Sequence, residues 1–144
     1  MELTRRDLSV LLPAVFAANA WSAEKSMSML PSGIYPFDKL TVKESPNGNK
    51  SWQVFTGTTH EGYPIDMHIT ELAPGNMPHP EHHHVHEEMI MMIEGEVLVT
   101  ILDRTEKIGP GGMAYVHSNE QHGWKNVGTG PARYYVLAIG HQAT

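Results

Sequence analysis

Along most of the chain after Phe37, apolar and polar residues alternate with the period of two that is typical of half-buried β-strands. The stretch from Ile65 to Thr70 is a clear example, because every second residue is apolar. Clusters of glycine, proline and asparagine interrupt the alternation, as tight turns do. The pattern predicts strands at Asp38–Glu44, Ser51–Thr58, Ile65–Leu72, Met89–Ile93, Val97–Leu102, Glu106–Ile108, Met113–His117, Gln121–Val127 and Ala132–Ile139.

The alternation also predicts which side chains share a face. In the second predicted strand, Trp52, Val54 and Thr56 would lie on one face, and Gln53 and Phe55 on the other. No long helix and no internal repeat is expected. We therefore predict a single all-β domain.

The run Met89–Ile93 is apolar at every position, which predicts a strand that is covered on both faces. Its methionines are interpreted as core residues, because flexible thioether side chains fill irregular gaps well. Copper binding by these methionines is the remoter interpretation.

The composition narrows the classes of function. The chain has 144 residues, enough for one domain with its own core, and a formal net charge of −6 at pH 7. This mild acidity, without a basic stripe, argues against a nucleic-acid surface. The absence of cysteine excludes disulfides, a thiolate nucleophile and zinc sites built on sulfur. Any metal site must use nitrogen and oxygen ligands.

The segment with the most chemistry is residues 81–88, EHHHVHEE, which contains four histidines and three glutamates. If it is extended, alternate side chains from His82 to Glu88 share one face, so imidazoles and a carboxylate can converge on one point. Such groups are common ligands of divalent transition metals. The alternative is a solvated polar loop, which is less fitting because an apolar strand follows Glu88 directly. Downstream, His122 occupies a strand-like position and can add another imidazole.

This segment resembles the first sequence motif of the cupin superfamily. That motif combines two histidines and a glutamate with a glycine at each end. It maps onto Gly75, His82, His84, Glu88 and Gly95, with one extra residue between Gly75 and His82.

A later segment resembles the second cupin motif. It maps onto Gly111, His122 and Asn126 with the spacing intact. Two turn positions differ, because His117 replaces a proline and Asn119 replaces a glycine. The exact turn before His122 is therefore left open.

The resemblance implies a small jelly-roll β-barrel that holds one divalent transition metal. The implied ligands are His82, His84, Glu88 and His122. Manganese or iron is favoured, while zinc, nickel, copper and cobalt stay open.

Three further residues share the parity of the implied ligands and are expected in the substrate pocket or behind the ligands: His86, Trp124 and Asn126. Trp124 would supply an apolar wall and an N–H donor, and Asn126 would orient a ligand or a turn, although ordinary barrel packing suits both equally. His86 could be a further ligand or a proton shuttle, but we interpret it as a neighbouring surface imidazole. No dedicated acid or base stands out.

Residues 1–23 have the pattern of an export signal. Arg5 and Arg6 precede an apolar stretch, and small-residue cleavage sites follow at Ala20 and Ala23. The arginine pair resembles a twin-arginine signal, with the general secretory route and an N-terminal amphipathic helix as alternatives. We therefore predict a periplasmic protein with a signal peptide at 1–23, a linker or arm at 24–36 and a cupin barrel at 37–144. Export in a folded state would load the metal in the cytoplasm, which favours manganese or iron.

These features predict an exported metalloenzyme that acts on a small oxygen-rich molecule. An ion with three imidazoles and one carboxylate keeps about two positions for substrate or dioxygen. Dioxygenase chemistry is favoured, with decarboxylase or isomerase chemistry as options. The alternative is a non-catalytic cupin that binds a small ligand or a metal. The resemblance also implies a homodimer in which residues 34–44 lie across the partner; no nucleic acid and no membrane span in the mature chain are expected.

Overall fold

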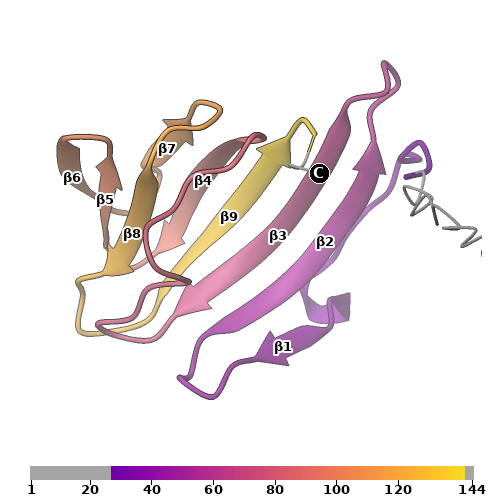
Figure 1. The fold of residues 1–144 in the computed structure, drawn as a ribbon. Helices are drawn as coiled ribbons and strands as arrows, with labels where there is room; N and C mark the ends of the chain where they lie inside the picture. Colours follow the sequence, from indigo (N-terminus) through magenta and orange to yellow (C-terminus); the bar gives the residue numbers. More distant parts are fainter. Residues whose placement is uncertain (1–26, 142–144) are drawn as a thin grey trace, which may run out of the picture.

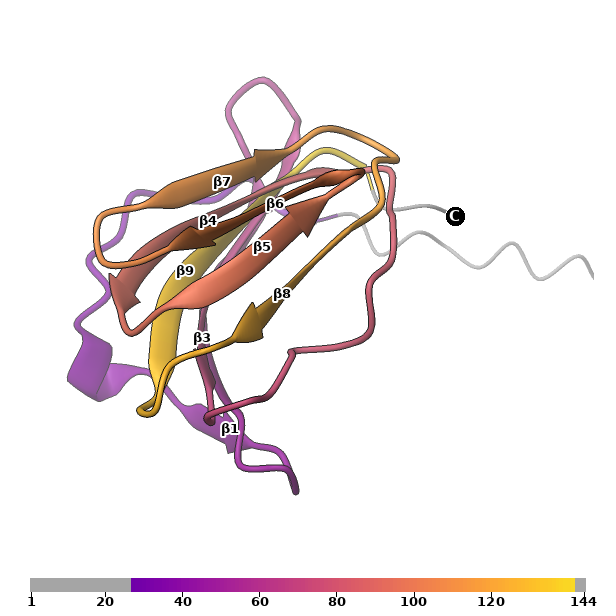
Figure 2. The ribbon, with the colours of Figure 1, turned by 90° about the vertical axis from the view of Figure 1, so that its left-hand side faces the viewer.

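The computed structural model describes residues 27–141, which form two antiparallel β-sheets (Figure 1). The larger sheet has the strand order β1-β2-β3-β9-β4-β7 and the smaller one the order β6-β5-β8. Figure 2 shows the smaller sheet facing β4, β7 and β9. The strands are β1 Val42–Glu44, β2 Lys50–Thr58, β3 Pro64–Leu72, β4 Glu87–Glu94, β5 Val97–Ile101, β6 Arg104–Ile108, β7 Met113–Val116, β8 His122–Asn126 and β9 Ala132–Ile139.

The core lies between the two sheets and uses the alternation predicted from the sequence. The larger sheet contributes the buried side chains of Ile90 (β4) and Tyr134 (β9). The smaller sheet contributes those of Val97 (β5) and Trp124 (β8). Burying apolar area of this kind is the dominant favourable term in folding. The all-β jelly-roll prediction is confirmed.

The first predicted strand, Asp38–Glu44, is wrong over its first half. Phe37–Lys39 forms a 3-10 helix (η1), and only the last part of the predicted strand, β1, pairs with β2. The helix closes because the N–H groups of Lys39 and Leu40 donate to the carbonyls of Pro36 and Phe37 at 3.0 and 3.1 Å. A local hydrogen-bonded turn has replaced the extended chain.

A β-bulge in β2 overturns the predicted division of its faces. Trp52 pairs with Ile69, but the register shifts between Gln53 and Phe55, so Phe55 pairs with Met67. Trp52 and Phe55 therefore share a face, because an extra residue reverses the alternation beyond it. Gln53, before the bulge, and Thr56, after it, lie on the opposite face, toward the barrel interior.

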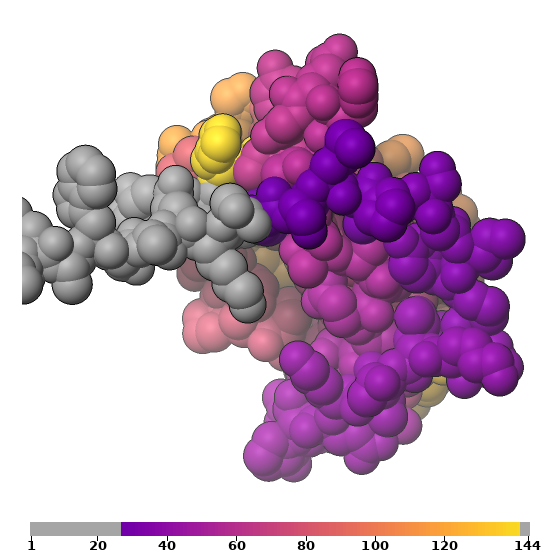
Figure 3. All heavy atoms as spheres, turned by 90° about the vertical axis from the view of Figure 1, so that its right-hand side faces the viewer, coloured from indigo at the N-terminus to yellow at the C-terminus, as the bar shows by residue number. Residues whose placement is uncertain are grey.

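The segment before β1 lies along the edge of β2, where Figure 3 shows it in indigo against the magenta strands. The N–H of Leu30 donates to the carbonyl of Thr58 at 2.9 Å, and the N–H of Thr58 donates to the carbonyl of Ser28 at 3.1 Å. Gly57 permits this approach, because a Cβ there would lie 2.9 Å from the Ser28 carbonyl oxygen. In the single chain this segment thus pairs with its own barrel.

The outer face of β4 is more open than predicted. Ile90 and Met92 are buried, but Met89 and Met91 are only half-buried and Ile93 is exposed. The smaller sheet covers the inner face alone, so the expectation of a strand covered on both faces is wrong. Within residues 27–141, no helix has the length and apolar character needed to cross a membrane.

Candidate metal centre

The histidine-rich segment is a loop that runs alongside β8 before it enters β4. His82 and His122 exchange two backbone hydrogen bonds of 3.0 and 2.8 Å, which holds the loop against the start of β8. Strand β4 begins only at Glu87, so the segment from His82 to Glu88 is not one continuous strand and the condition of an extended segment is not met. The prolines just before the loop cannot donate to a ladder, which disfavours a regular strand there.

The turn before His122 also positions the loop. Asn119, which replaces a motif glycine, adopts a left-handed φ of 62°, a conformation that asparagine tolerates better than most residues. Its backbone N–H donates to the carbonyl of His84 at 2.7 Å. The substituted turn therefore ties the two motif segments together.

The imidazole of His122 is fully buried and has a defined tautomer. Its Nδ1 lies 2.8 Å from the carbonyl oxygen of Glu120, which can only accept, so Nδ1 carries the proton. Its Nε2 is buried and lacks a hydrogen-bond partner among the described residues. A buried lone pair without a partner is costly, and a metal ion would satisfy it.

His84 has the same tautomer and faces a carboxylate. Its Nδ1 donates to the carbonyl of His86 at 2.8 Å, while its Nε2 lies 2.8 Å from Oε2 of Glu88. A neutral Nε2 and a carboxylate oxygen are both acceptors, so a proton or a metal ion has to lie between them. The imidazole nitrogen and the carboxylate oxygen together fit a divalent cation as its ligands.

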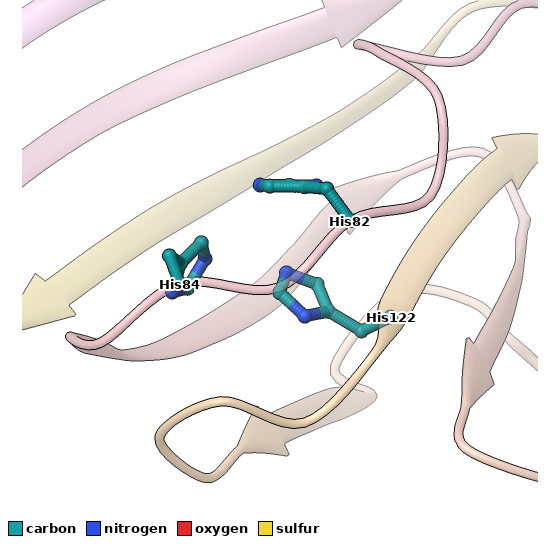
Figure 4. Close-up of side chains that lie close together, drawn as sticks. All are labelled: His82, His84 and His122. Carbon is teal, nitrogen blue, oxygen red and sulfur yellow. The ribbon is translucent and has the colours of Figure 1, made fainter. Parts of the chain in front are cut away.

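His82 completes a group of three imidazoles. One nitrogen from each of His82, His84 and His122 lies within 4.8 Å of the others, and Figure 4 shows the three rings gathered on one side of the loop and β8. Burial, and then the neighbouring His79, His122 and His84, lower the pKa of His82. The neutral imidazole, which is the metal-binding form, is therefore favoured.

The predicted fourth ligand, Glu88, belongs to an adjoining group. It lies with His84 and His86 in a second cluster whose ligand atoms are within 4.8 Å of one another. His84 is common to both groups. The structure thus brings the four implied ligands to one region, and their ligation of a metal stays a prediction.

His86 is buried, so its interpretation as a surface imidazole is wrong. Its ring stacks on that of His84 with centroids 3.6 Å apart, and its Nε2 is 3.6 Å from Oε2 of Glu88. Its Nδ1 has no partner within the described part of the chain. Burial, followed by the proximity of His84, lowers the pKa of His86.

Trp124 and Asn126 lie behind the imidazoles in the core. Trp124 stacks on His122 with ring centroids 5.5 Å apart, but its N–H donates to the hydroxyl of Tyr134 at 2.8 Å and is already used. The amide of Asn126 donates to the carbonyls of Leu72 and Gly130, both at 2.9 Å. Trp124 thus packs against an implied ligand and Asn126 holds the turn after β8; both arrangements also suit ordinary barrel packing, and the roles of these residues at the site stay predictions.

His79 is not one of the positions that define the two sequence motifs. In the structure its ring meets the edge of His82 with centroids 4.1 Å apart, and lies 6.4 Å from Trp124. Parity could not reveal this contact, because the loop has no regular repeat. A cavity of about 250 Å³ lies elsewhere, beside Ile101 and Ala114, and none of the histidines lines it.

Comparison with known proteins agrees with this architecture. The profile of the cupin domain matches residues 68–139, half of the chain. No curated protein sequence gives a match. Solved structures give similar folds at sequence identities too low to show more than the fold.

Three of these structures cover most of the chain. KdgF from Halomonas sp. is 13% identical with a TM-score of 0.66, over 76% of this chain and 95% of its own. An RmlC-like cupin from Shewanella frigidimarina is 16% identical with a TM-score of 0.63, over 76% and 93%. The polyketide cyclase RemF from Streptomyces resistomycificus is 17% identical with a TM-score of 0.62, over 79% and 83%. With its two sheets and its paired histidine motifs, the chain belongs to the cupin superfamily.

Proposed function

We propose that this cupin is a metalloenzyme that acts on a small oxygen-rich molecule, with a divalent ion held by His82, His84, Glu88 and His122. The observation that supports this proposal most is the convergence of three imidazoles from two separate chain segments. His84 and His122 each donate Nδ1–H to a backbone carbonyl, which turns Nε2 toward the site, and the Nε2 of His122 has no other partner among the described residues.

The chain's own residues would shape the reaction in two ways. Trp124 forms an apolar wall against His122, which excludes water from one side of the site. His86 stacks on His84 and limits its motion. When bound, a divalent ion would polarise an oxygen-rich substrate and stabilise developing negative charge on its oxygen. Dioxygenase chemistry with iron or manganese is our first choice, ahead of decarboxylation or isomerisation; RemF shows that the fold occurs among enzymes.

Elemental analysis of the purified protein, isolated without added metal or chelator, tests the metal site. We expect about one equivalent of a divalent transition metal per chain, with iron or manganese favoured because export in a folded state would load the metal in the cytoplasm. His84→Ala should lose most of this metal, whereas His83→Ala should keep it, because His83 is exposed and belongs to neither ligand group. Equal metal content in the two variants would show that the ligand assignment is wrong.

Turnover separates the enzyme from the alternative, a non-catalytic cupin that binds a ligand or a metal. The imidazoles of His79 and His86, which are not among the four implied ligands, are compatible with the alternative, because extra histidines raise metal capacity. Oxygen uptake by the iron- or manganese-loaded protein with enediols, catechols or keto acids supports the oxygenase. Stoichiometric metal with no turnover on any of them, or zinc as the resident ion, would move the oxygenase to second place.

Export and dimerisation also remain predictions. The signal peptide at 1–23 lies outside the described residues, so N-terminal sequencing of periplasmic protein would test cleavage after Ala20 or Ala23. Light scattering tests the homodimer, for which the single chain offers an outer sheet face with exposed Met113 and Tyr115. A monomer at micromolar concentration would remove the dimer prediction.

A further inference from the structure

The inner face of the larger sheet is closed at one end and open at the other. On β3, Leu72 and Thr70 are buried, whereas the side chains of His68 and Asp66 are each 31% exposed. Neighbouring Thr56 on β2 is exposed. The inner face therefore carries a row of polar side chains that becomes accessible toward the end of the barrel where β4 begins.

The strand register places this row beside the metal centre. Thr56 pairs with Asp66, Asp66 with Ala138 and Ala138 with Glu88, so these four residues lie in one line across β2, β3, β9 and β4. Paired residues point to the same face of a sheet. Two strand spacings put the Cα atoms of Asp66 and Glu88 about 10 Å apart. The residue between them in this line is Ala138, whose side chain is a single methyl group.

A cavity of about 170 Å³ lies at the Asp66 end of this line. Its lining includes Thr56, Asp66, Ala138 and Gly140. Gly140 also adjoins the metal centre, because a Cβ placed on it would lie 3.7 Å from the Cα of His86. The cavity thus borders Thr56 and Asp66 of the polar row and approaches the residues around the proposed ion at Gly140, whereas His68 and the implied ligands do not line it.

Within the row, Asp66 and His68 are two neighbouring hydrogen-bond acceptors. Asp66 Oδ1 lies 3.2 Å from Nδ1 of His68, and Asp66 Oδ2 accepts a hydrogen bond of 2.7 Å from the amide of Gln53. Burial alone would raise the pKa of Asp66, but the hydrogen bonds from His68 and Gln53 outweigh it and leave that pKa below its usual value. Because the carboxylate can only accept, the neutral tautomer of His68 that fits this contact has its proton on Nδ1 and a lone pair on Nε2.

We propose that Asp66 and His68 form a subsite for neighbouring hydroxyl groups on a ligand whose acidic end binds at the metal centre, so that the preferred ligand is a polyhydroxylated acid. This inference rests on the proposed metal centre for the acidic end of the ligand. The carboxylate of Asp66 and Nε2 of His68 accept hydrogen bonds from two hydroxyls, and the Thr56 hydroxyl offers a third polar contact. A ligand without hydroxyl groups would displace water from these two side chains and give them no hydrogen bonds in return. The subsite therefore selects against aliphatic acids.

Binding of gluconate and hexanoate to the metal-loaded protein, measured by calorimetry, tests the subsite. The two acids have the same number of carbons and differ in their hydroxyl groups. We expect gluconate to bind about tenfold or more tightly than hexanoate, and Asp66→Asn and His68→Leu each to remove about that factor. His60→Leu is the matched control, because His60 is exposed in the turn between β2 and β3. It should leave the gluconate affinity unchanged.

Two further measurements separate the subsite from the metal centre. Oxalate needs only the ion, so its affinity and the metal content should be the same in the wild type and both subsite variants. Nε2 of His68 should also shift in the nitrogen NMR spectrum with gluconate and not with oxalate. Failure of oxalate to bind metal-loaded protein would count against the metal centre alone, whereas equal affinity for gluconate and hexanoate in the wild type would overturn the subsite.

Discussion

The imidazole of His84 shows how much of the candidate site depends on single hydrogen bonds. It belongs to both groups of possible ligands, and its Nδ1 bond to the carbonyl of His86 decides which nitrogen faces Glu88. The sequence motif identified this histidine, but it could not reveal the carbonyl that fixes its tautomer. At the scale of residues, the site is organised by contacts with the backbone.

Asn126 is a second such residue, and its removal should destabilise the protein. It is fully buried; its amide donates to two carbonyls, and its side-chain oxygen accepts a 2.9 Å bond from the N–H of Gly128. We expect Asn126→Ala to lower the free energy of unfolding by about 3 kcal/mol, because three backbone groups lose a partner. Urea denaturation measures this. Asn76→Ala, a less buried amide, should cost about 1 kcal/mol or less; equal costs would contradict the prediction.

At the scale of elements, the motif glycines explain where the strands turn. Gly75, Gly95 and Gly111 have φ values of 79°, 75° and 81°, in the left-handed region that favours glycine. The sequence therefore predicted the places of these turns correctly. It failed in β2, because nothing in the residues around Gln53 signals the bulge that reverses the faces.

Two of these glycines form a matched pair for mutation. A Cβ at Gly95 would lie 2.7 Å from the Cα of Ala132, whereas one at Gly111 would meet open space. Both variants pay the left-handed strain of about 1 kcal/mol, and Gly95→Ala adds a clash with backbone atoms. We expect Gly111→Ala to cost about 1 kcal/mol and Gly95→Ala about 3 kcal/mol or more. Thermal unfolding followed by circular dichroism compares them, and similar melting temperatures would refute the clash.

At the scale of the whole molecule, the proposed ion joins the two sheets. Its candidate ligands come from the loop before β4 and from the start of β8, which belong to different sheets. A ligand that binds only the folded state stabilises it by mass action. Metal binding and global stability should therefore be coupled.

A metal titration followed by thermal unfolding checks this coupling. At a free manganese concentration one hundred times the dissociation constant, we expect about 2.7 kcal/mol of added stability, equivalent to about 10 °C in melting temperature. His84→Ala should lose the increase, and His83→Ala should retain it. A melting temperature that does not respond to any divalent metal would argue that the ligands are not brought together in solution.

The sequence by itself determined most of the strands, most turns and the chemical identity of the implied ligands. These features depend on local periodicity and on residue type, as the alternation from Ile65 to Thr70 and the spacing of His82 and His84 illustrate. Only the tertiary structure decided that His86 is buried, and that Asp66 stands in line with Glu88 across two strands. Burial and register depend on pairings between segments far apart in the chain, which local patterns do not encode.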